Sequence, residues 1–568
     1  MNHAPLRPHT MFGAVADALA SMSSQTAMLL LAATVAPAVV AVTLLVSANK
    51  DAVKAPRVMT TLASLPWPVG SAVALGVGNV AFVAECARHA CSCFSLVVFG
   101  KNFTFMTSKR AVSLFFTSRN VTFLPAVEQW TSRIFRLPAT EFRRHHQDIL
   151  SALRQAIDPR ENAEHMASTC RNILSRVGVA PGETRTDLVE LCHGLAFEAG
   201  VRAVFGDAMF EATRPRLREC FETFEDQFEL AASPLPHALL RNWSASRKEL
   251  LCMLEEGYSK GWMEGSMAAR LVDTSHIPRP HYSNVLLSLL WASQANTAPG
   301  LFWTTAFLLL PENEKHLRRV LAEARDAAAR GSGDVVEGCV QVALDGAAHI
   351  HRCVAEALRL RSPGIAVRFA SMDVEVDDRP SACTRIPRGR TLAICPFYLQ
   401  HHPEFQAGEP WRYDPDRVGL CDGLAGFAKG QVSGVVWGGG VYRCPGRRLA
   451  ETELALLSTM ILTRFEATVA RAPRTRGASQ DQSFARRLAA RVSKFLGWRA
   501  LGVGLPDIVD TVIGMDIQDG DRAATQQKMW KGDTGDPNGV LPPYVPHKLV
   551  GIRIPFESCP VVLSRRVQ

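Results

Sequence analysis

The chain has 568 residues, of which 21% are charged, and carries a formal net charge of +9. This length allows one large buried core, and no internal repeat divides it, so we expect one large domain. The modest charge comes without a basic-aromatic motif, which argues against nucleic acid as a partner. The 14 cysteines are irregularly spaced and do not define a disulfide framework. The sequence therefore favours a single domain with reduced thiols.

The amino-terminal part predicts a membrane anchor. After an N-terminal segment (residues 1–26), the stretch 27–46 has no charged residue and is long enough to span a bilayer. A cleaved signal peptide is the alternative, but its apolar region is normally 7–15 residues long. Basic residues follow at Lys50, Lys54 and Arg57, so the positive-inside rule predicts a cytosolic main domain. Residues 47–70 form a proline-containing linker, and the main domain spans 71–568.

The first part of the main domain predicts a hairpin followed by helices. Apolar residues alternate over 93–106, with a turn at 100–102. Residues 141–157 and 184–205 have the pattern of helices, as does most of the chain up to about residue 360. We therefore expect a mainly α fold with small β-sheets (α+β), one sheet at each end.

An apolar helix is predicted over Leu289–Trp303, with a polar patch that includes Asn296 and Thr297. Pro299 follows the patch and predicts a kink, because proline removes a helix hydrogen bond. Taken alone, the pattern also fits a core helix with a few satisfied polar side chains.

A helical pair and a series of short elements come next. Glu356 and Arg359 are one helical turn apart, a spacing that also occurs in solvated ion pairs. An extended segment with Arg368 follows, then a turn at 386–389 and the segment 413–417, which ends in Arg417.

The most informative stretch is Trp437–Gly446, which presents Cys444 on a glycine-rich loop before a helix that begins at Arg447. A thiolate in this position is favoured by the helix dipole, and the glycines allow close approach to a flat group. A buried structural thiol is the alternative. The helix should end near Phe465, followed by a strand at 466–469. An insert (470–548) containing a basic amphipathic stretch at 484–498 separates this strand from a terminal strand at 551–555.

These motifs, in this order, resemble those of the cytochrome P450 family. The resemblance implies that Cys444 is the axial ligand of a haem b iron. Trp437 stands at the aromatic position of the family loop, and tyrosine stands at 442 in place of the usual arginine. The resemblance implies that a further set of residues binds the haem: Arg443, Arg368, Trp437, Gly440 and Gly446. It also implies a buried ion triad of Glu356, Arg359 and Arg417.

The helix with Asn296 and Thr297 resembles the branch that contains cholesterol 7α-hydroxylase and prostacyclin synthase. By this resemblance, Thr297 and Asn296 shape the oxygen pocket, with Asn296 where the family usually has an acid. The first expectation is a monooxygenase acting on a sterol or related lipid by hydroxylation or oxidative demethylation. It would use O2 and electrons from NADPH through a separate P450 reductase.

Two other functions remain open. One is an isomerase of fatty-acid endoperoxides, similar to prostacyclin synthase. The other is a non-catalytic haem-binding or structural membrane protein. The proline-containing linker resembles that of microsomal family members, which implies a single-pass anchor in the endoplasmic reticulum membrane with a cytosolic catalytic domain.

Overall fold

The computed structural model describes residues 57–58, 83–84, 86–87, 92–98, 101–177, 184–233, 236–362, 364–379, 382–402, 404–406, 409–417, 420, 435–470, 541 and 559–566. The predicted anchor (27–46), most of the linker and nearly all of the 470–548 insert lie outside these residues, as does the strand expected at 551–555. Among the described residues, no helix has both the length and the apolar content needed to cross a bilayer.

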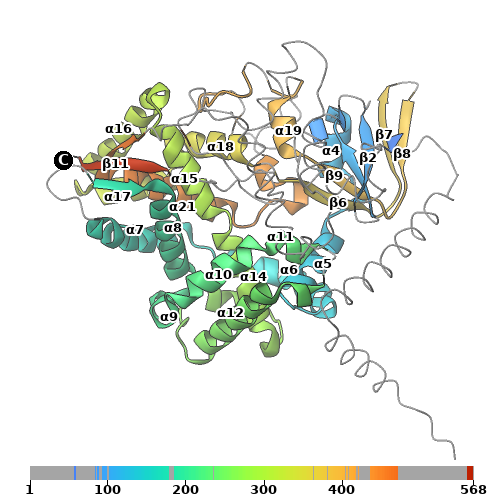
Figure 1. The fold of residues 1–568 in the computed structure, drawn as a ribbon, viewed down its shortest axis with the longest axis horizontal. Helices are drawn as coiled ribbons and strands as arrows, with labels where there is room; N and C mark the ends of the chain where they lie inside the picture. Colours follow the sequence, from blue (N-terminus) through green and yellow to red (C-terminus); the bar gives the residue numbers. More distant parts are fainter. Residues whose placement is uncertain are drawn as a thin grey trace, which may run out of the picture.

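Helices make up most of the described chain (Figure 1), as the sequence predicts. The α-helices are α4 (Lys109–Thr117), α5 (Leu124–Ile134), α6 (Ala139–Ala156), α7 (Pro159–Arg176), α8 (Leu188–Phe205), α9 (Asp207–Thr213), α10 (Arg216–Asp226), α11 (Phe228–Ala232), α12 (Arg241–Ser259), α13 (Met267–Thr274), α14 (Tyr282–Gln294), α15 (Thr297–Leu308), α16 (Glu314–Arg330), α17 (Val335–Leu344), α18 (His349–Arg361), α19 (Pro396–His401) and α21 (Arg447–Arg464). The 3-10 helices are η1 (His237–Leu239), η2 (Arg279–His281), η3 (Pro311–Asn313), η4 (Val435–Trp437) and η5 (Gly440–Tyr442).

The larger sheet has six strands in the order β1-β2-β3-β9-β6-β4. Their bounds are β1 (Arg57–Val58), β2 (Cys93–Val98), β3 (Lys101–Met106), β9 (Thr391–Ile394), β6 (Ala366–Ala370) and β4 (Val121–Thr122). The predicted hairpin is confirmed, because β2 and β3 pair antiparallel from Cys93↔Met106 to Val98↔Lys101. The turn is tighter than expected, since Lys101 and Asn102 already pair with β2. A separate two-stranded ribbon joins β7 (Val374–Arg379) to β8 (Ala382–Ile386).

The smaller sheet has the order β10-β11-β5, built from β10 (Phe465–Val469), β11 (Pro560–Arg565) and β5 (Thr184–Asp187). The helix expected over 184–205 is therefore wrong in its first turn, where β5 pairs with β11 instead. Asp187 ends β5 and begins α8, because its carboxylate accepts a hydrogen bond from the backbone N–H of Val189. The same carboxylate accepts a hydrogen bond from the backbone N–H of Cys559 at 2.9 Å.

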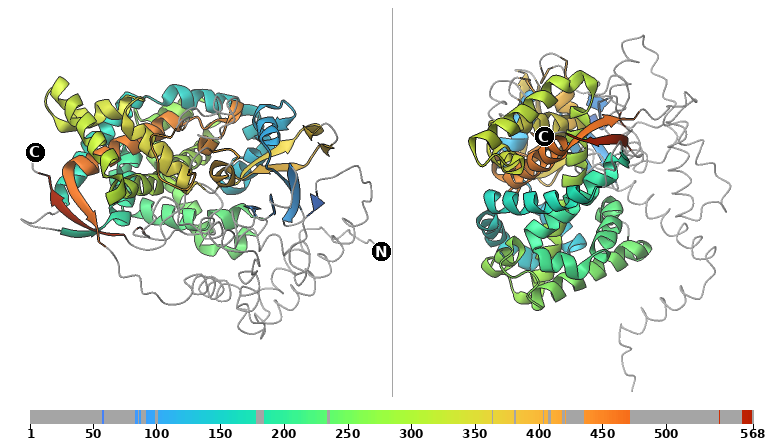
Figure 2. Two further views of the ribbon diagram at one scale, coloured as in Figure 1. Left: turned by 90° about the horizontal axis from the view of Figure 1, so that it is seen from above. Right: turned by 90° about the vertical axis from the view of Figure 1, so that its left-hand side faces the viewer.

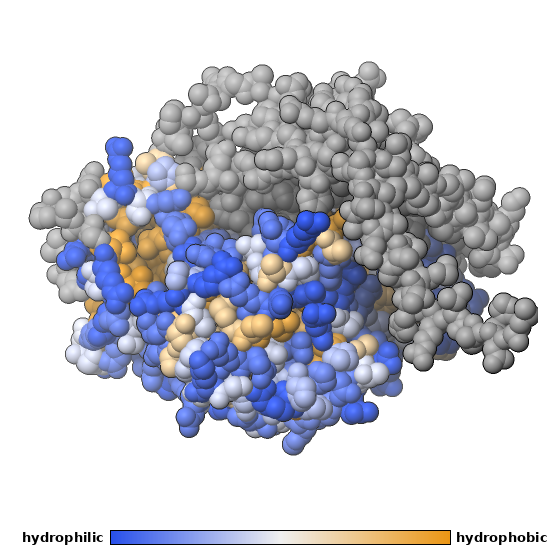
Figure 3. Space-filling view, turned by 60° about the horizontal axis from the view of Figure 1, so that its bottom comes forward, coloured by the Kyte–Doolittle hydropathy of each residue, from blue (hydrophilic) through white to orange (hydrophobic). Residues whose placement is uncertain are grey.

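The two sheets lie at opposite ends of the molecule, with the helices between and below them (Figures 1 and 2). One apolar cluster fills the helical part, and α15 is buried along its whole length except Ala298. A second cluster lies between the six-stranded sheet, α4 and α19. On the face shown in Figure 3, the described surface is mostly hydrophilic, with apolar residues gathered in narrow bands. The core therefore surrounds α15, α18 and α21, the helices on which the predicted site residues or their neighbours lie.

Candidate functional site

Cys444 lies on a closed loop between η5 and α21. Its backbone N–H donates a hydrogen bond to the carbonyl of Trp437 at 2.9 Å, which draws the two ends of the loop together. Gly438 and Gly440 have φ angles of 70° and 64°, in the left-handed region that glycine tolerates best. The Cys444 residue is exposed, and α21 begins three positions later at Arg447. The loop therefore presents the cysteine beside the first turn of a helix, as the sequence predicts.

The nearest glycines before and after Cys444, Gly440 and Gly446, differ in how much space surrounds them. A Cβ atom at Gly440 would lie 2.5 Å from the carbonyl oxygen of Phe116, so contact between the loop and the end of α4 requires glycine there. A Cβ atom at Gly446 would meet no described protein atom within 4 Å. This open side next to Cys444 fits the predicted approach of a flat prosthetic group.

The protonation of Cys444 is set by its surroundings. Although the residue as a whole is exposed, the protein atoms around the sulfur desolvate it and raise the pKa of the Cys444 thiol; a backbone hydrogen bond with Gly446 lowers this pKa, the charge of Glu451 raises it, and that of Arg447 lowers it. A coordinating metal ion deprotonates a thiol outright, so the raised pKa does not oppose the predicted role as an iron ligand.

Arg368 is a buried cation that contacts this loop. It lies on β6, is 4% exposed, and donates a hydrogen bond from Nη2 to the carbonyl of Gly439 at 3.2 Å. Its guanidinium carbon lies 4.4 Å from the ring centre of Tyr442 and 5.1 Å from that of Phe115. Burial lowers the pKa of Arg368 to about 10.

Two of the donor atoms of Arg368 have no hydrogen-bond partner among the described residues. These atoms, Nε and Nη1, are both buried. A buried charge with unmet donors is costly unless an anion pairs with it. The two donors therefore fit a carboxylate such as a haem propionate. Arg368 is bonded to Gly439, which lies in the same loop as Cys444, so the anion partner and the thiol belong to one site.

The other predicted loop residues have different surroundings. Arg443 is exposed, so the buried Arg368 is the better candidate to hold a propionate. Tyr442 stands where arginine was expected, and its hydroxyl shares a 3.0 Å hydrogen bond with the hydroxyl of Thr122 on β4. Trp437 is half-buried and packs against the main apolar cluster.

The predicted apolar helix is two helices. It breaks between the end of α14 at Gln294 and the start of α15 at Thr297, and not at Pro299. Proline is tolerated in the first turn of a helix, where its missing N–H would have no partner. Pro299 is the third residue of α15, so the predicted kink at this proline is wrong in position.

The break is held by side-chain and backbone bonds. The hydroxyl of Thr297 donates to the carbonyl of Ser293 at 2.7 Å, and Asn296 occupies the N-cap position of α15. Thr297 is buried and Asn296 is half-buried. α15 packs against α21, the helix that follows the Cys444 loop.

A buried carboxyl that the sequence did not reveal lies near this break. Glu453 of α21 is 4% exposed, and burial raises its pKa to about 8. A Cβ atom on Gly200 of α8 would lie 2.6 Å from Nε2 of Gln294 and 3.1 Å from Oε1 of Glu453, so both side chains meet over this glycine. The available signal was an acidic residue among the apolar residues of α21.

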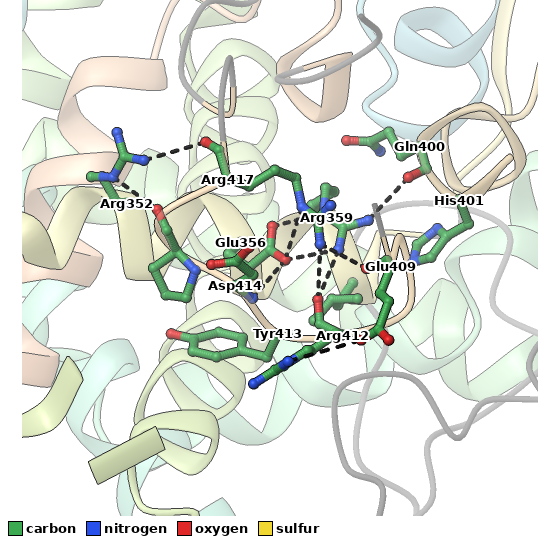
Figure 4. Close-up of polar contacts among 12 residues, drawn as sticks. Arg352, Glu356, Arg359, Gln400, His401, Glu409, Arg412, Tyr413, Asp414 and Arg417 are labelled. Carbon is green, nitrogen blue, oxygen red and sulfur yellow. Dashed lines mark hydrogen bonds and ion pairs between the residues drawn. The ribbon is translucent and has the colours of Figure 1, made fainter. Parts of the chain in front are cut away.

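The predicted ion triad comes together between α18, which carries Glu356 and Arg359, and the segment that carries Arg417 (Figure 4). Arg359 donates from Nε and Nη2 to the two carboxylate oxygens of Glu356 at 2.7 and 2.8 Å. Arg417 approaches the same carboxylate, with Nε 3.5 Å from Oε1, and the backbone N–H of Asp414 donates to Oε1 at 3.0 Å. All three charged side chains are buried. Glu356 is therefore the shared centre of the group.

The two guanidinium groups also hold the chain around them. Arg359 donates to the carbonyls of Gln400 at 3.0 Å and Arg412 at 3.4 Å. Arg417 donates to the carbonyls of Glu409 at 2.9 Å and Arg412 at 3.2 Å. Burial, and then the charge of Arg359, lower the pKa of Arg417. The triad thus fastens α19 and the segment 409–417 to α18.

Comparisons with known proteins agree with this geometry. The family model for cytochrome P450 matches residues 266–486, which include α15, the triad and the Cys444 loop. The 24-hydroxycholesterol 7-alpha-hydroxylase of Homo sapiens is 24% identical over 71% of this chain and 86% of that protein. The 25-hydroxycholesterol 7-alpha-hydroxylase of Rattus norvegicus is 26% identical over 49% of this chain and 71% of that protein.

A solved structure supports the fold. Retinoic acid bound cyanobacterial CYP120A1 superposes with a TM-score of 0.57 at 19% identity, over 73% of this chain and 93% of that one. The fold is that of the cytochrome P450s, and residues 266–486, which carry the triad and the Cys444 loop, match the family model for cytochrome P450, a class of haem-thiolate oxidoreductases. The chain is a P450 monooxygenase related to sterol hydroxylases, and within the family it resembles the 7α-hydroxylase branch.

Proposed function

We propose that this monooxygenase oxidises a sterol or related lipid, by hydroxylation or oxidative demethylation, with O2 and electrons from NADPH delivered by a separate P450 reductase. The observation that carries the proposal is the pairing of Cys444 with Arg368. Cys444 is exposed on its loop, and the buried Arg368 donates a hydrogen bond to the carbonyl of Gly439 in that loop. Two donor atoms of Arg368 have no hydrogen-bond partner among the described residues. These residues offer a thiolate and an anion partner to one haem.

Each residue has a separate role in the proposal. Cys444 provides the axial ligand, and Arg368 pairs with a propionate. When bound through a thiolate, the haem supplies the activation of dioxygen. The Thr297 hydroxyl donates to the Ser293 carbonyl, so its lone pairs remain available to accept a hydrogen bond from water. Asn296 can orient that water but cannot deliver a proton by titrating.

The substrate class rests on relatives and on the expected location. The relatives named above act on oxysterols, and the 5-beta-cholestane-3-alpha,7-alpha-diol 12-alpha-hydroxylase of Sus scrofa is 25% identical over 71% of this chain and 85% of that protein. A bilayer anchor at 27–46 would place the enzyme in the endoplasmic reticulum membrane, where an apolar substrate partitions. These observations favour a sterol over a fatty-acid endoperoxide.

Aromatic side chains beside α14 are consistent with an apolar substrate. Phe228 of α11 stacks on Trp291 of α14, with ring centres 4.2 Å apart, and Phe135 packs against both rings. The indole N–H of Trp291 donates to Glu225 at 2.7 Å, so its polar atom is satisfied. Trp291 lies one turn before the break that carries Asn296 and Thr297.

The test incubates the purified full-length protein with a P450 reductase and a membrane sterol extract, with and without NADPH, and analyses products by mass spectrometry. A sterol that gains oxygen or loses a methyl group only with NADPH supports the proposal and identifies the substrate. Rearrangement of an endoperoxide without NADPH, with no sterol oxidised, would instead support the isomerase. Cys444→Ser should abolish turnover, whereas Cys252→Ser, at an exposed cysteine of α12, should not. Full activity in Cys444→Ser would overturn both enzymatic functions.

A further inference from the structure

Two histidines and an aspartate meet on the side of the 409–417 segment that faces α16. His316 is the third residue of α16, His349 is the first residue of α18, and Asp416 immediately precedes Arg417 of the triad. Nδ1 of His316 lies 2.9 Å from Nε2 of His349, and the rings stack with their centres 5.1 Å apart. One ligand atom from each of the three residues lies within 4.8 Å of the other two.

The histidine pair is buried, and its bonding is incomplete. His316 is 4% exposed and His349 is fully buried. Nδ1 of His349 has no hydrogen-bond partner among the described residues. One hydrogen bond joins the two rings, so one imidazole donates a proton and the other accepts it. The nitrogens that face each other, Nδ1 of His316 and Nε2 of His349, are the two that one metal ion could bind in place of this hydrogen bond.

Both histidines are in the state that metal ions bind. Burial lowers the pKa of His349 to about 4, with Arg319 as the next cause, and burial also lowers the pKa of His316. Burial therefore favours the neutral form of each ring, which keeps a lone pair on one nitrogen. Neutral imidazole is the form that coordinates metals, so no proton has to be displaced from a charged ring.

We propose that His316, His349 and Asp416 form a zinc site that is separate from the haem. Two imidazole nitrogens bound to one tetrahedral zinc are about 3.3 Å apart, given Zn–N distances of about 2.0–2.1 Å. The present 2.9 Å separation needs to widen by only about 0.4 Å. Asp416 is exposed, so it supplies a carboxylate ligand on the side from which the ion enters, and water completes the coordination.

Both basic and acidic side chains lie near this site, and their effects on a bound cation are opposite. Lys315 and Arg319 each approach a carboxylate oxygen of Asp416 at 4.0 Å, and both side chains are more than half exposed. Exposed ion pairs at this distance are weak, so direct coordination to zinc outweighs them. Two acidic groups also face the histidines: Glu323, which accepts the backbone N–H of His349 at 2.7 Å, and Asp414. The surroundings therefore do not exclude a cation.

A zinc ion here would add to the bonds that already join three segments, such as the hydrogen bond from Arg352 of α18 to the carbonyl of Pro415 at 2.8 Å. It would cross-link α16 and α18 to the segment that carries Arg417. His316 also packs edge-on against Tyr413, whose hydroxyl donates to the carbonyl of Cys353 on α18. The ion would thus fix the segment at Asp416, next to Arg417 of the triad, and its role would be structural.

The test uses the haem-loaded full-length protein after removal of adventitious metal with a chelator. Zinc binding is measured by isothermal titration calorimetry on the wild type, on Asp416→Asn and on Asp326→Asn. The last variant is the matched control, because Asp326 is an exposed carboxylate on α16 away from the site. We expect one zinc per chain, affinity at least about 10-fold weaker in Asp416→Asn, and no change in Asp326→Asn.

X-ray absorption at the zinc edge then identifies the ligands. Imidazole scattering with nitrogen and oxygen at about 2.0–2.2 Å supports the site, whereas sulfur at about 2.3 Å would assign the zinc to cysteines and overturn the proposal. Equal affinity in the wild type and Asp416→Asn would also overturn it, as would no zinc binding by the wild type. Retention of haem by Asp416→Asn verifies that this variant is folded.

Discussion

Glu356→Gln replaces the carboxylate at the centre of the buried triad with a neutral amide of the same shape. The change retains one oxygen to accept the backbone N–H of Asp414, but it places an amide donor against the guanidinium donors of Arg359. The variant then holds two arginines, 1% and 8% exposed, with no carboxylate between them. Their remaining partners are backbone carbonyls, which carry only partial charge.

The expected loss follows from this uncompensated burial. Removing one partner of a buried ion pair costs about 3–5 kcal/mol. A native protein is stable by about 5–15 kcal/mol in total, so the loss is a large fraction of the reserve. A matched surface variant, Glu314→Gln, breaks the ion pair between Glu314 and Arg318, whose side chains are 58% and 75% exposed. An exposed pair at this helical spacing contributes only about 0.3–0.5 kcal/mol.

The two variants are compared by urea denaturation of the haem-loaded protein, followed by circular dichroism and by haem absorbance. Glu356→Gln should lower the midpoint strongly, and Glu314→Gln should leave it nearly unchanged. The reasoning would be refuted by equal midpoints in the two variants, because that result would mean that the triad contributes no more than a surface pair.

Three further predictions concern the site and its surroundings. Arg368→Met should lower haem affinity about 10–100-fold, because a hydrogen bond to a charged group contributes about 1.5–3 kcal/mol, while Arg368→Lys should lose less; haem content after dilution measures both. Equal retention in all three proteins would contradict the propionate role. Thr297→Val should form about 10-fold less product per NADPH consumed, because it lacks the hydroxyl. Thr297→Ser keeps a hydroxyl and should form nearly as much product as the wild type. Equally low product in the serine variant would contradict a role of the hydroxyl in the reaction. For Glu453, the folded-state pKa of about 8 exceeds the ordinary value, so the folded state binds the extra proton and stability falls by about 1.4 kcal/mol per pH unit as pH rises from about 4.5 to 8. Glu453→Gln should remove this decline in the denaturation midpoint, and an identical pH slope in both proteins would refute it.

The parts of the site that sequence reasoning predicted depend on neighbours in the chain or on motif order. Cys444 and its glycines lie within ten residues, and the loop that they form is closed by a local bond from Cys444 to Trp437. Glu356 and Arg359 lie one turn apart on a single helix. The approach of Arg417 could be expected only because its segment follows in the order of a known family.

The parts that were missed depend on tertiary packing. A proline suggested a kink at 299, but the bond from Thr297 to Ser293 and the buried environment of α15 fix the break earlier. In the sequence, Glu453 looks like an ordinary solvated acid on a helix. Its burial is apparent only once α8 and α14 are seen to pack beside it. The aromatic rings around Arg368 come from α4, from Phe123 before α5 and from the cysteine loop, which no local pattern joins.

The position of the last strand has a consequence for synthesis. β5 lies at an edge of the smaller sheet and pairs with β11, and the Asp187 carboxylate that begins α8 bonds Cys559, 372 residues further along the chain. At a synthesis rate of about 5–20 residues per second, β5 leaves the ribosome roughly 20–75 s before its partner. During that time β5 lacks β11, the strand with which it pairs, and the Asp187 carboxylate lacks the hydrogen bond from Cys559. The nascent chain therefore carries an open strand edge through most of its translation, a period in which a chaperone or slow pausing could decide the yield of folded protein.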